Sequence, residues 1–471
     1  MENFEREELR GIGLAAVDWA AGYVEQLRER PLVRKTSAGE VRGRLDRTLP
    51  VEGCGFEELM RDVDGVIREF SRHNGHPRFF GYVSSPGVAV AAAASLIQSV
   101  LNINVTGWRS GAVACEIERL TVEWLREMIG YPQTGMGLLV SGGSMANLAG
   151  LAAARARKGN GPVYATEETH FSVKKAARLL GMGPVRAVAV DEGLRMRPDA
   201  LAERIAEDRA AGLNPAVVVA SAGTAGTGAV DRIGEIARVV REAGIWLHVD
   251  GAYGALAALA PSARGLFAGI EEADSVSLDP HKWLYMPVGT GCVLYRDAAS
   301  ARAAFGETAE YIRVVGLEQD EAFAFWDYGP ELSRPFRALP LWMLVRSFGV
   351  KALGEAIEEN LDCARYFAEL VARCSDVEML CPVGLSIFCF RYRPAGFTGD
   401  LDALNEKVMV RLQQGGSSYV SNARVGGAFA MRGCVLNYRT RREDMEVLLD
   451  DVRAAGRSVL EDLGPSLQIG V

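Results

Sequence analysis

Short apolar runs alternate with helical patterns through the middle of the chain. The runs are rich in β-branched residues and are bounded by Gly, Pro and polar residues, as buried strands are. We predict strands at residues 138–140, 163–165, 217–220, 245–249, 275–278 and 292–294. Helical patterns, such as the one at 233–242, lie between several of them. This alternation predicts an α/β fold with a mostly parallel sheet that is covered on both faces.

Both ends of the chain depart from this alternation. Before the sheet, residues 7–30 and 56–70 place apolar residues at helical spacing, so we expect two amphipathic helices there. From about Gly349 the pattern changes to a long helix, then to strands at 386–391 and 432–437, and to a last helix from Arg442. We therefore expect a helical N-terminal segment, a large domain and a small α+β domain. Their predicted bounds are residues 1–75, 76–348 and 349–471.

Composition excludes several classes of function. The chain has 471 residues, 49% of them hydrophobic, which is enough to bury a large core. A formal net charge of -8 disfavours nucleic acid or a membrane surface as a partner. No apolar run of about eighteen residues predicts a transmembrane helix, and residues 1–10 lack the apolar core of a signal peptide. Eight cysteines without a C-x-x-C pair favour a reducing cytoplasm over disulfides, and we expect no metal site.

Polar residues that follow the predicted strands are the candidates for chemistry, because open α/β sheets bind ligands beyond the carboxyl ends of their strands. Ser-Gly-Gly-Ser at 141–144 follows the first strand and precedes a helix. Glycines and a helix N-terminus suit an anion. The spacing differs from that of ATP and NAD loops, which disfavours those cofactors. An ordinary strand-to-helix turn stays the alternative.

Three later strand ends carry His170, Asp250 and Lys282. His170 can cap the helix that follows or stack its flat ring on a flat cofactor. Asp250 ends a buried run, so it needs hydrogen bonds or a cation, for which an arginine or a protonated pyridine nitrogen would serve. Lysine is rarely buried without purpose, and desolvation makes Lys282 a nucleophilic amine suited to a Schiff base. His281 beside it can donate to a phosphate.

Together these features form an anion loop, a stacking histidine, a strand-end aspartate and a strand-end lysine. Pyridoxal-5′-phosphate (PLP) needs four matching functions, which are a phosphate anchor, a ring stack, a partner for the pyridine nitrogen and a carrier for its aldehyde. Each feature alone has an ordinary structural explanation. Their combination in one chain predicts a PLP site.

The chain resembles the PLP-dependent group II amino-acid decarboxylases, which include the aromatic-L-amino-acid decarboxylases. The most specific motifs are 248–253 (His-Val-Asp-Gly-Ala-Tyr) and 279–283 (Asp-Pro-His-Lys-Trp), and the likeness extends from 76–80 to 437–440. The resemblance implies an aspartate-aminotransferase-like, fold-type I homodimer with the active site at the subunit interface. It also implies that the chain decarboxylates an L-amino acid, so its expected partner is a small-molecule amino-acid substrate.

By this resemblance, Lys282 carries PLP as a Schiff base, Asp250 pairs with the pyridine nitrogen, and His170 stacks on the ring. Phosphate is expected at Gly143 and Ser144. The full set expected to bind the cofactor is Gly143, Ser144, His170, Thr224, Asp250, Ala252, Asp279, His281 and Lys282. Several members have Asn at the position of Asp279, and an Asp near a phosphate calls for a neighbouring cation.

Tyr311 matches the catalytic tyrosine that such members carry on a mobile loop. We expect it to protonate the substrate carbon, with His170 as helper. The oxygen-consuming aldehyde synthases of the family tend to lose this tyrosine, so its presence favours simple decarboxylation. An aminotransferase and an inactive binding protein are further alternatives. The intact Asp250, Lys282 and His170 argue against the last.

Substrate choice depends on the aromatic residues that remain near the expected pocket, which are Tyr82, Phe80 and Trp108. Animal members specific for aromatic substrates have larger apolar residues at four positions, where this chain has Asn74, Val83, Asn104 and Thr106. The pocket is therefore expected to be wider and more polar. We expect an aromatic L-amino acid first and an acidic or other polar L-amino acid second.

Overall fold

A seven-stranded sheet forms the centre of the structure, a computed structural model that describes residues 5–307 and 321–463. Its strands are β1 (Met136–Val140), β2 (Val163–Ala165), β3 (Val185–Ala187), β4 (Val217–Ser221), β5 (Trp246–Asp250), β6 (Ser275–Leu278) and β7 (Gly291–Tyr295). They lie in the order β1-β7-β6-β5-β4-β2-β3. Pairing is parallel from β6 to β3, and β7 runs antiparallel to both of its neighbours. The predicted α/β fold with a mostly parallel sheet is confirmed.

Helices cover this sheet so completely that every residue of β4, β5, β6 and β7 is buried. Strands without an exposed face need helices on both sides of the sheet. The helices of this region are α5 (Ala112–Met128), α6 (Gly143–Lys158), α7 (Phe171–Leu179), α8 (Pro198–Ala210), α9 (Ile233–Ala243), α10 (Pro280–Trp283) and α11 (Ala298–Phe305). Among them, α6 packs along β5, β6 and β7 and begins directly after β1.

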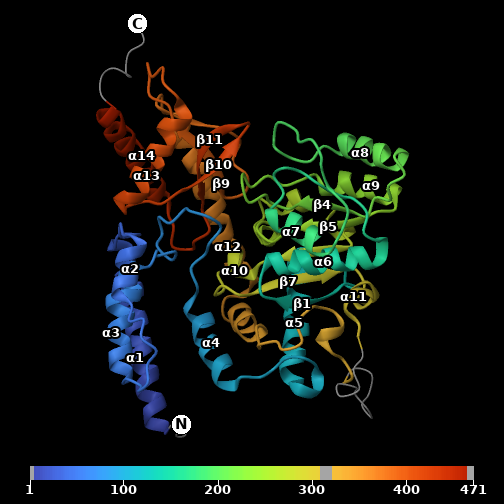
Figure 1. Ribbon diagram of the computed structural model, residues 1–471, viewed down its shortest axis with the longest axis horizontal. Coiled ribbons are helices and arrows are strands. Elements are labelled where there is room, and N and C mark those ends of the chain that lie inside the picture. Colours follow the sequence, from blue (N-terminus) through green and yellow to red (C-terminus); the bar gives the residue numbers. More distant parts are fainter. Residues whose placement is uncertain (1–4, 308–320, 464–471) are drawn as a thin grey trace.

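A second, antiparallel sheet follows in the C-terminal part, shown in orange and red in Figure 1. Its strands are β8 (Val377–Met379), β9 (Ile387–Tyr392), β10 (Ser421–Val425) and β11 (Ala428–Cys434), in the order β10-β11-β9-β8. Two helices, α13 (Leu401–Gly415) and α14 (Arg442–Leu463), pack against each other beside this sheet. Helix α12 (Ala338–Ala372) leads into it and is interrupted at Gly349, whose φ is 71°.

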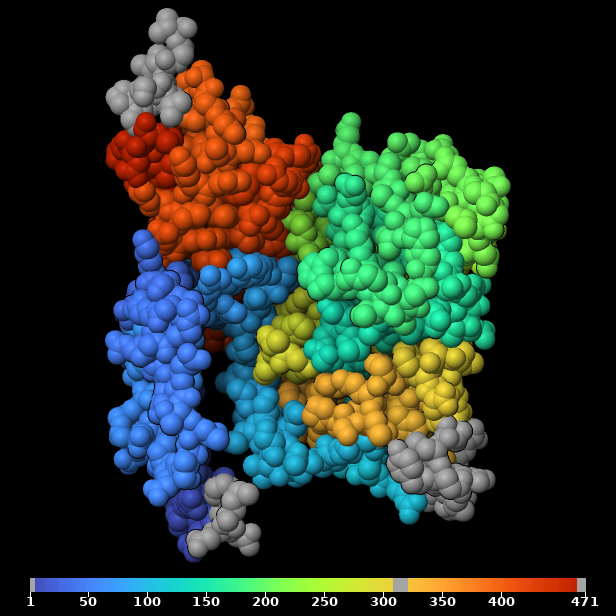
Figure 2. Space-filling view, in the orientation of Figure 1, coloured from blue at the N-terminus to red at the C-terminus, as the bar shows by residue number. Residues whose placement is uncertain are grey.

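The N-terminal helices stand apart from both sheets. They are α1 (Arg6–Glu25), α2 (Ala38–Arg44) and α3 (Phe56–Asp62), and α4 (Ala89–Leu101) follows them. Figure 2 shows α1 to α3 as a blue column beside the body, with a gap along its lower part. No residue of α1 is buried. Apolar side chains are exposed on α1 and α4, namely Leu9, Leu14, Val17, Val24, Leu96, Ile97, Val100 and Leu101.

None of the helices in residues 5–307 and 321–463 combines the length and the apolar character that crossing a membrane requires.

Candidate active site

A cavity of about 340 Å³ lies beyond the carboxyl ends of β4, β5 and β6 and is closed on one side by the start of α6. Strand ends of one sheet meet at the same edge, so residues that are far apart along the chain converge there. All nine residues that the sequence predicted for the cofactor line this cavity. The sheet edge therefore assembles the predicted set.

Asp250 is a buried carboxylate of this cavity. It is 7% exposed at the end of β5. Its carboxylate accepts hydrogen bonds from Asn147 Nδ2 (2.9 Å), Ser277 Oγ (3.1 Å) and the Ala252 amide (3.2 Å). These three donors are neutral, and no Lys, Arg or His of the described residues forms an ion pair with it. A buried carboxylate without a cation is costly, so the site calls for a cationic partner.

A chain of buried hydrogen bonds that starts at Trp246 orients the Asp250 carboxylate. Trp246 Nε1 donates to Ser275 Oγ (2.9 Å), and the Ser275 hydroxyl lies 2.8 Å from His248 Nδ1. His248 Nε2 lies 2.9 Å from Asn147 Oδ1, an acceptor, so the proton of the neutral ring is on Nε2. Burial lowers the pKa of His248 to about 4, opposed by the charge of Asp250. The ring therefore stays neutral, and the Asn147 amide is held with its NH2 group toward Asp250.

The first turn of α6 forms a narrow cup. A Cβ on Gly143 would lie 2.6 Å from the Cβ of Ala252 and 2.7 Å from Asp279 Oδ2, so no larger residue fits there. The first backbone N–H groups of a helix lack intrahelical acceptors and carry its positive dipole end. Gly143 and Ser144 stand at this start. The cup suits an anion such as a phosphate.

Lys282 lies in the short helix α10, and its Nζ is 2.9 Å from Asp279 Oδ2. Asp279 is 3% exposed, and its Oδ1 has no hydrogen-bond partner. His281 Nδ1 is 2.7 Å from the carbonyl oxygen of Thr290, so it donates there and leaves Nε2 for the cavity. The cation that the sequence required beside Asp279 is therefore Lys282 itself.

His170 caps the helix that follows it and also lines the cavity, so stacking on a cofactor stays a prediction. Its Nδ1 accepts the Ser172 backbone N–H (3.3 Å) as the cap of α7, and the ring also lines the cavity. Because Nδ1 is the acceptor, the neutral ring carries its proton on Nε2. Burial lowers the pKa of His170, while the charge of Asp250 opposes the shift. The side chain is thus a neutral ring with one N–H free of the cap.

Comparisons with known proteins agree with this geometry. The pyridoxal-dependent decarboxylase conserved domain matches residues 39–393. An aromatic-L-amino-acid decarboxylase of Bacillus atrophaeus is 35% identical over 462 residues, which cover 96% of both chains. The chain belongs to the pyridoxal-dependent decarboxylase family.

Two further similarities place this decarboxylase within its family. The crystal structure of Oryza sativa TDC with PLP and tryptamine superposes with a TM-score of 0.92 at 28% identity, covering 97% of this chain and 99% of that one. A phenylacetaldehyde synthase of Petunia hybrida is 28% identical over 456 residues, covering 91% of this chain and 90% of its own. The predicted fold-type I architecture and the predicted PLP-dependent decarboxylase class are confirmed.

PLP is the cofactor of this family, and the cavity fits it. The cup at Gly143 accepts a phosphate, Asp250 lacks a cation, and Lys282 supplies a primary amine at the same edge. The ring of His170 and the small side chain of Ala252 border the remaining space. Thr224 also lines the cavity and is buried, and its hydroxyl accepts the Ala229 amide (3.1 Å).

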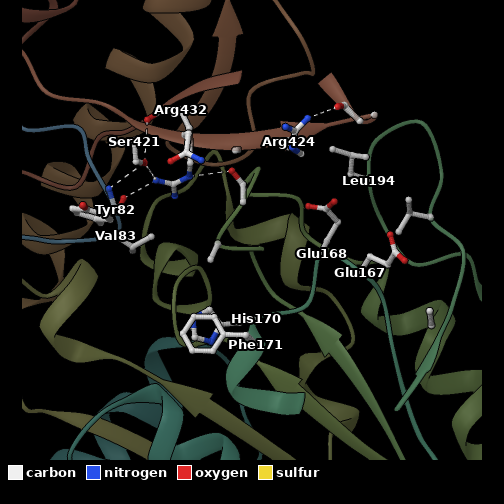
Figure 3. A pocket seen from close by; sticks show the side chains of 18 of the residues that line it. Tyr82, Val83, Glu167, Glu168, His170, Phe171, Leu194, Ser421, Arg424 and Arg432 are labelled. Atoms are coloured by element: carbon white, nitrogen blue, oxygen red, sulfur yellow. Dashed lines mark hydrogen bonds between the residues drawn. The ribbon is translucent and has the colours of Figure 1, made fainter. Parts of the chain in front are cut away.

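A larger cavity of about 1240 Å³, here called the vestibule, adjoins the cofactor cavity and shares Lys282 and His170 with it. Tyr82 and Val83 line one side, and the β10–β11 hairpin lines another (Figure 3). The vestibule therefore lies between the two sheets of the decarboxylase.

Sequence analysis missed Arg432, the buried cation of the vestibule. It is 3% exposed and donates to the carbonyl oxygens of Gly226 (3.0 Å) and Tyr82 (2.7 Å), as Figure 3 shows. Its Nη2 has no hydrogen-bond partner, and no carboxylate of the described residues pairs with it. An arginine inside a predicted strand was the only signal in the sequence.

Two predicted substrate contacts, Phe80 and Trp108, line neither cavity, and a third predicted residue cannot be placed. Phe80 is a core residue rather than a substrate contact, because it is 1% exposed and packs into the core of the C-terminal sheet. Its backbone bonds to Tyr419 and Cys434 hold it there. Trp108 borders neither cavity, so its contact with a substrate stays a prediction that needs a second subunit. Tyr311 lies outside the described residues.

Proposed function

We propose that this decarboxylase converts an aromatic L-amino acid, of the tyrosine, tryptophan or dopa class, to its amine and CO2. The observation that carries the proposal is Asp250, a buried carboxylate with three neutral donors and no cation of its own. A protonated pyridine nitrogen completes it. The similarity to an aromatic-L-amino-acid decarboxylase supports the substrate class.

Each residue of the cavity then has a task. PLP bound there supplies an electron sink for the bond between Cα and the substrate carboxylate. Asp250 keeps a proton on the ring nitrogen, which strengthens that sink. Lys282 holds the cofactor covalently, and the cup at Gly143 and Ser144, with His281 beside it, anchors the phosphate. His170 would lie against the ring, and its Nε2–H, which the helix cap does not use, would be available to move a proton.

Tyr311 is our proposed proton donor to Cα after CO2 leaves. Protonation there gives an amine, whereas oxidation by dioxygen followed by hydrolysis with water gives an aldehyde, ammonia and hydrogen peroxide. A well-placed general acid contributes about 10²–10⁴-fold, which favours the amine. In Tyr311→Phe we expect amine formation to fall while CO2 release persists and peroxide appears. Amine produced at the wild-type rate without peroxide would contradict this assignment.

Arg432 favours a second candidate substrate, an acidic or other polar L-amino acid. Arg432 lines the vestibule and pairs with no carboxylate of the described residues, so this cation suits a carboxylate of a substrate. A panel of L-amino acids that includes tyrosine, tryptophan, dopa, phenylalanine, glutamate and aspartate separates the two, with CO2, amine and peroxide all measured. We expect the largest kcat/KM among the aromatic members. Turnover confined to glutamate or aspartate would contradict the aromatic assignment.

We also propose a homodimer in which the N-terminal segment contacts the partner subunit. The support is α1, a helix of 20 residues with none buried, together with the exposed apolar face of α4. Such surfaces are most often covered by isologous pairing. Sedimentation should give twice the mass of the chain. A fully active monomer would contradict the dimer.

Two further expectations stay proposals. The division into residues 1–75, 76–348 and 349–471 is supported at its second boundary by the break of α12 at Gly349. A cytoplasmic location is supported by the cysteines, all eight of which are free thiols. Limited proteolysis should cut first near residues 75 and 349, and fractionation of the source cells should place the protein in the cytoplasm.

A further inference from the structure

The cofactor cavity contains a second buried carboxylate, Asp279, whose surroundings differ from those of Asp250. Asp250 accepts three hydrogen bonds from neutral donors. Asp279 is more deeply buried, at 3% exposure, and Lys282 is the one lysine or arginine of the described residues that pairs with it, with Nζ 2.9 Å from Oδ2. Among the described residues, Asp279 takes no part in the hydrogen-bonded chain from Trp246 to Asp250, here called the relay, or in another network of side-chain hydrogen bonds. Its contact with Lys282 therefore needs its own explanation.

Within residues 5–307 and 321–463, no other side chain donates a hydrogen bond to the Asp279 carboxylate. Its Oδ1 has no hydrogen-bond partner, and His281 Nδ1, at 3.7 Å from Oδ1, is directed to the carbonyl oxygen of Thr290 instead. Glycines enclose the carboxylate: a Cβ on Gly291 would lie 2.9 Å from Oδ1, and one on Gly143 would lie 2.7 Å from Oδ2. The stability of the buried charge therefore depends on the ion pair with Lys282.

That ion pair opposes the chemistry for which Lys282 is placed. The nitrogen of an ammonium has no free electron pair and cannot attack an aldehyde. To capture an aldehyde, Lys282 releases one proton to solvent, and its nitrogen forms a bond to the aldehyde carbon. The carbonyl oxygen leaves as water, and a C=N bond results. The first event of this sequence breaks a charge-assisted contact with a buried carboxylate, which would be left without a cation.

We infer that Asp279 restrains the capture of PLP by Lys282, by holding the amine as an ion pair in the cofactor-free protein. The inference rests on the proposed function, in which Lys282 holds the cofactor. It assigns opposite effects to the two carboxylates of one cavity. Asp250 favours the bound cofactor, whereas Asp279 slows its attachment.

The test follows the capture of two aldehydes by the full-length, cofactor-free protein, using the absorbance of the C=N product in stopped flow. Asp279→Asn keeps the shape of the side chain and removes its charge, so the ion pair becomes a weaker neutral contact. We expect capture about fivefold faster than in the wild type. The two probes are PLP and pyridoxal, which lacks the phosphate. Both should accelerate by the same factor, because the ion pair involves only the amine.

Asp250→Asn is the matched control, since it neutralises the other carboxylate of the same cavity. We expect it to weaken equilibrium binding of PLP without accelerating capture. Asp279→Ala provides a second variant without charge, and thermal unfolding of each protein verifies that it is folded. Acceleration in both Asp279 variants and not in Asp250→Asn would support the inference.

Several results would overturn it. Capture at an unchanged or lower rate in folded Asp279→Asn would show that the ion pair does not limit attachment. Acceleration with PLP but not with pyridoxal would show that Asp279 acts on the phosphate instead. A wild-type protein that captures neither aldehyde would contradict the proposed function itself, and the inference with it.

Discussion

The cofactor cavity and the vestibule next to it are built in different ways. The cavity takes its residues from the ends of neighbouring strands of one sheet, and Asp250 at its floor is held by a relay of buried side chains. The vestibule joins segments that are distant in sequence, such as Tyr82 and Arg432, which are 350 residues apart. Its buried cation keeps one N–H group without a partner.

This difference separates the two parts of the function. The cavity presents bound and oriented groups to a cofactor that is the same throughout the family. The vestibule is formed by loops and by the β10–β11 hairpin, which meet there from distant parts of the chain. We therefore expect changes in the cavity to alter cofactor binding and changes in the vestibule to alter substrate choice.

The largest effect is expected at Asp250, where Asp250→Asn removes the charge opposite the pyridine nitrogen. A hydrogen bond to a charged group contributes about 1.5–3 kcal/mol, so PLP affinity should fall about 10- to 100-fold. Titration of PLP by absorbance measures it. If the variant bound PLP as the wild type does, Asp250 would not be the partner of the ring and the contrast with the vestibule would fail.

In the vestibule, Arg432→Met should leave PLP affinity unchanged. It removes the donor from the carbonyl groups of Gly226 and Tyr82, so the free energy of unfolding should fall by about 1–3 kcal/mol. We also expect a higher KM. Arg424→Met on the same hairpin is the control, because that side chain is 61% exposed and should change stability by less than about 0.5 kcal/mol. A large loss of PLP affinity in Arg432→Met would break the separation of the two regions.

Acid should destabilise the protein, partly through the relay of the cavity. Burial lowers the pKa of His248 and of His76 to about 4, so between pH 6.5 and 4 the unfolded chain binds two protons that the folded protein does not. Burial raises the pKa of Asp231 to about 6, so below that pH the folded protein binds one proton more. Unfolding therefore takes up about one proton net, so the free energy of unfolding falls by about 1 kcal/mol for each pH unit of acidification.

Urea midpoints measured at pH 7, 6 and 5 check this expectation. A replacement of His76, which lies away from both cavities, separates the contribution of that ring from that of the relay. Midpoints that rise on acidification would show that the carboxyl group of Asp231 dominates.

The smallest effect is expected from Val83→Phe, which narrows the vestibule without touching a charged group. Adding a few carbon atoms to the apolar wall of a substrate pocket changes the ratio of kcat/KM between two substrates by about tenfold. The ratio of kcat/KM for tryptophan to that for tyrosine should fall by about this factor. An unchanged ratio would place the substrate side chain elsewhere in the vestibule.

Much of the cavity was predictable from the sequence for a physical reason. Strands β4, β5 and β6 are buried along their whole length, so they appear as apolar runs, and the residue after each run must lie at the ligand-binding edge. Asp250 and Lys282 were found in this way. The relay partner Asn147 was not, because its role depends on contacts with Ser172, His248 and Asp250.

The vestibule was much less predictable. Strand β10 was missed because it is an edge strand with alternating exposed residues and polar composition. Strands β3 and β8 are as short as β2, but β2 is fully buried, whereas they have few buried residues and so no apolar run. The role of Arg432 depends on carbonyl groups 206 and 350 residues away. Phe80 was misplaced because its neighbour Tyr82 does line the vestibule, whereas its own side chain turns into the C-terminal core.

The central claim is that Lys282 carries the cofactor in the cavity that Asp250 completes. Borohydride reduction of the yellow, PLP-loaded protein, followed by mass spectrometry of its peptides, tests it most directly. The account predicts that the cofactor is fixed to the peptide that contains Lys282, and that Lys282→Arg, which retains the charge beside Asp279, leaves no labelled peptide. Label on another lysine, or a protein that decarboxylates without any reducible cofactor, would contradict it.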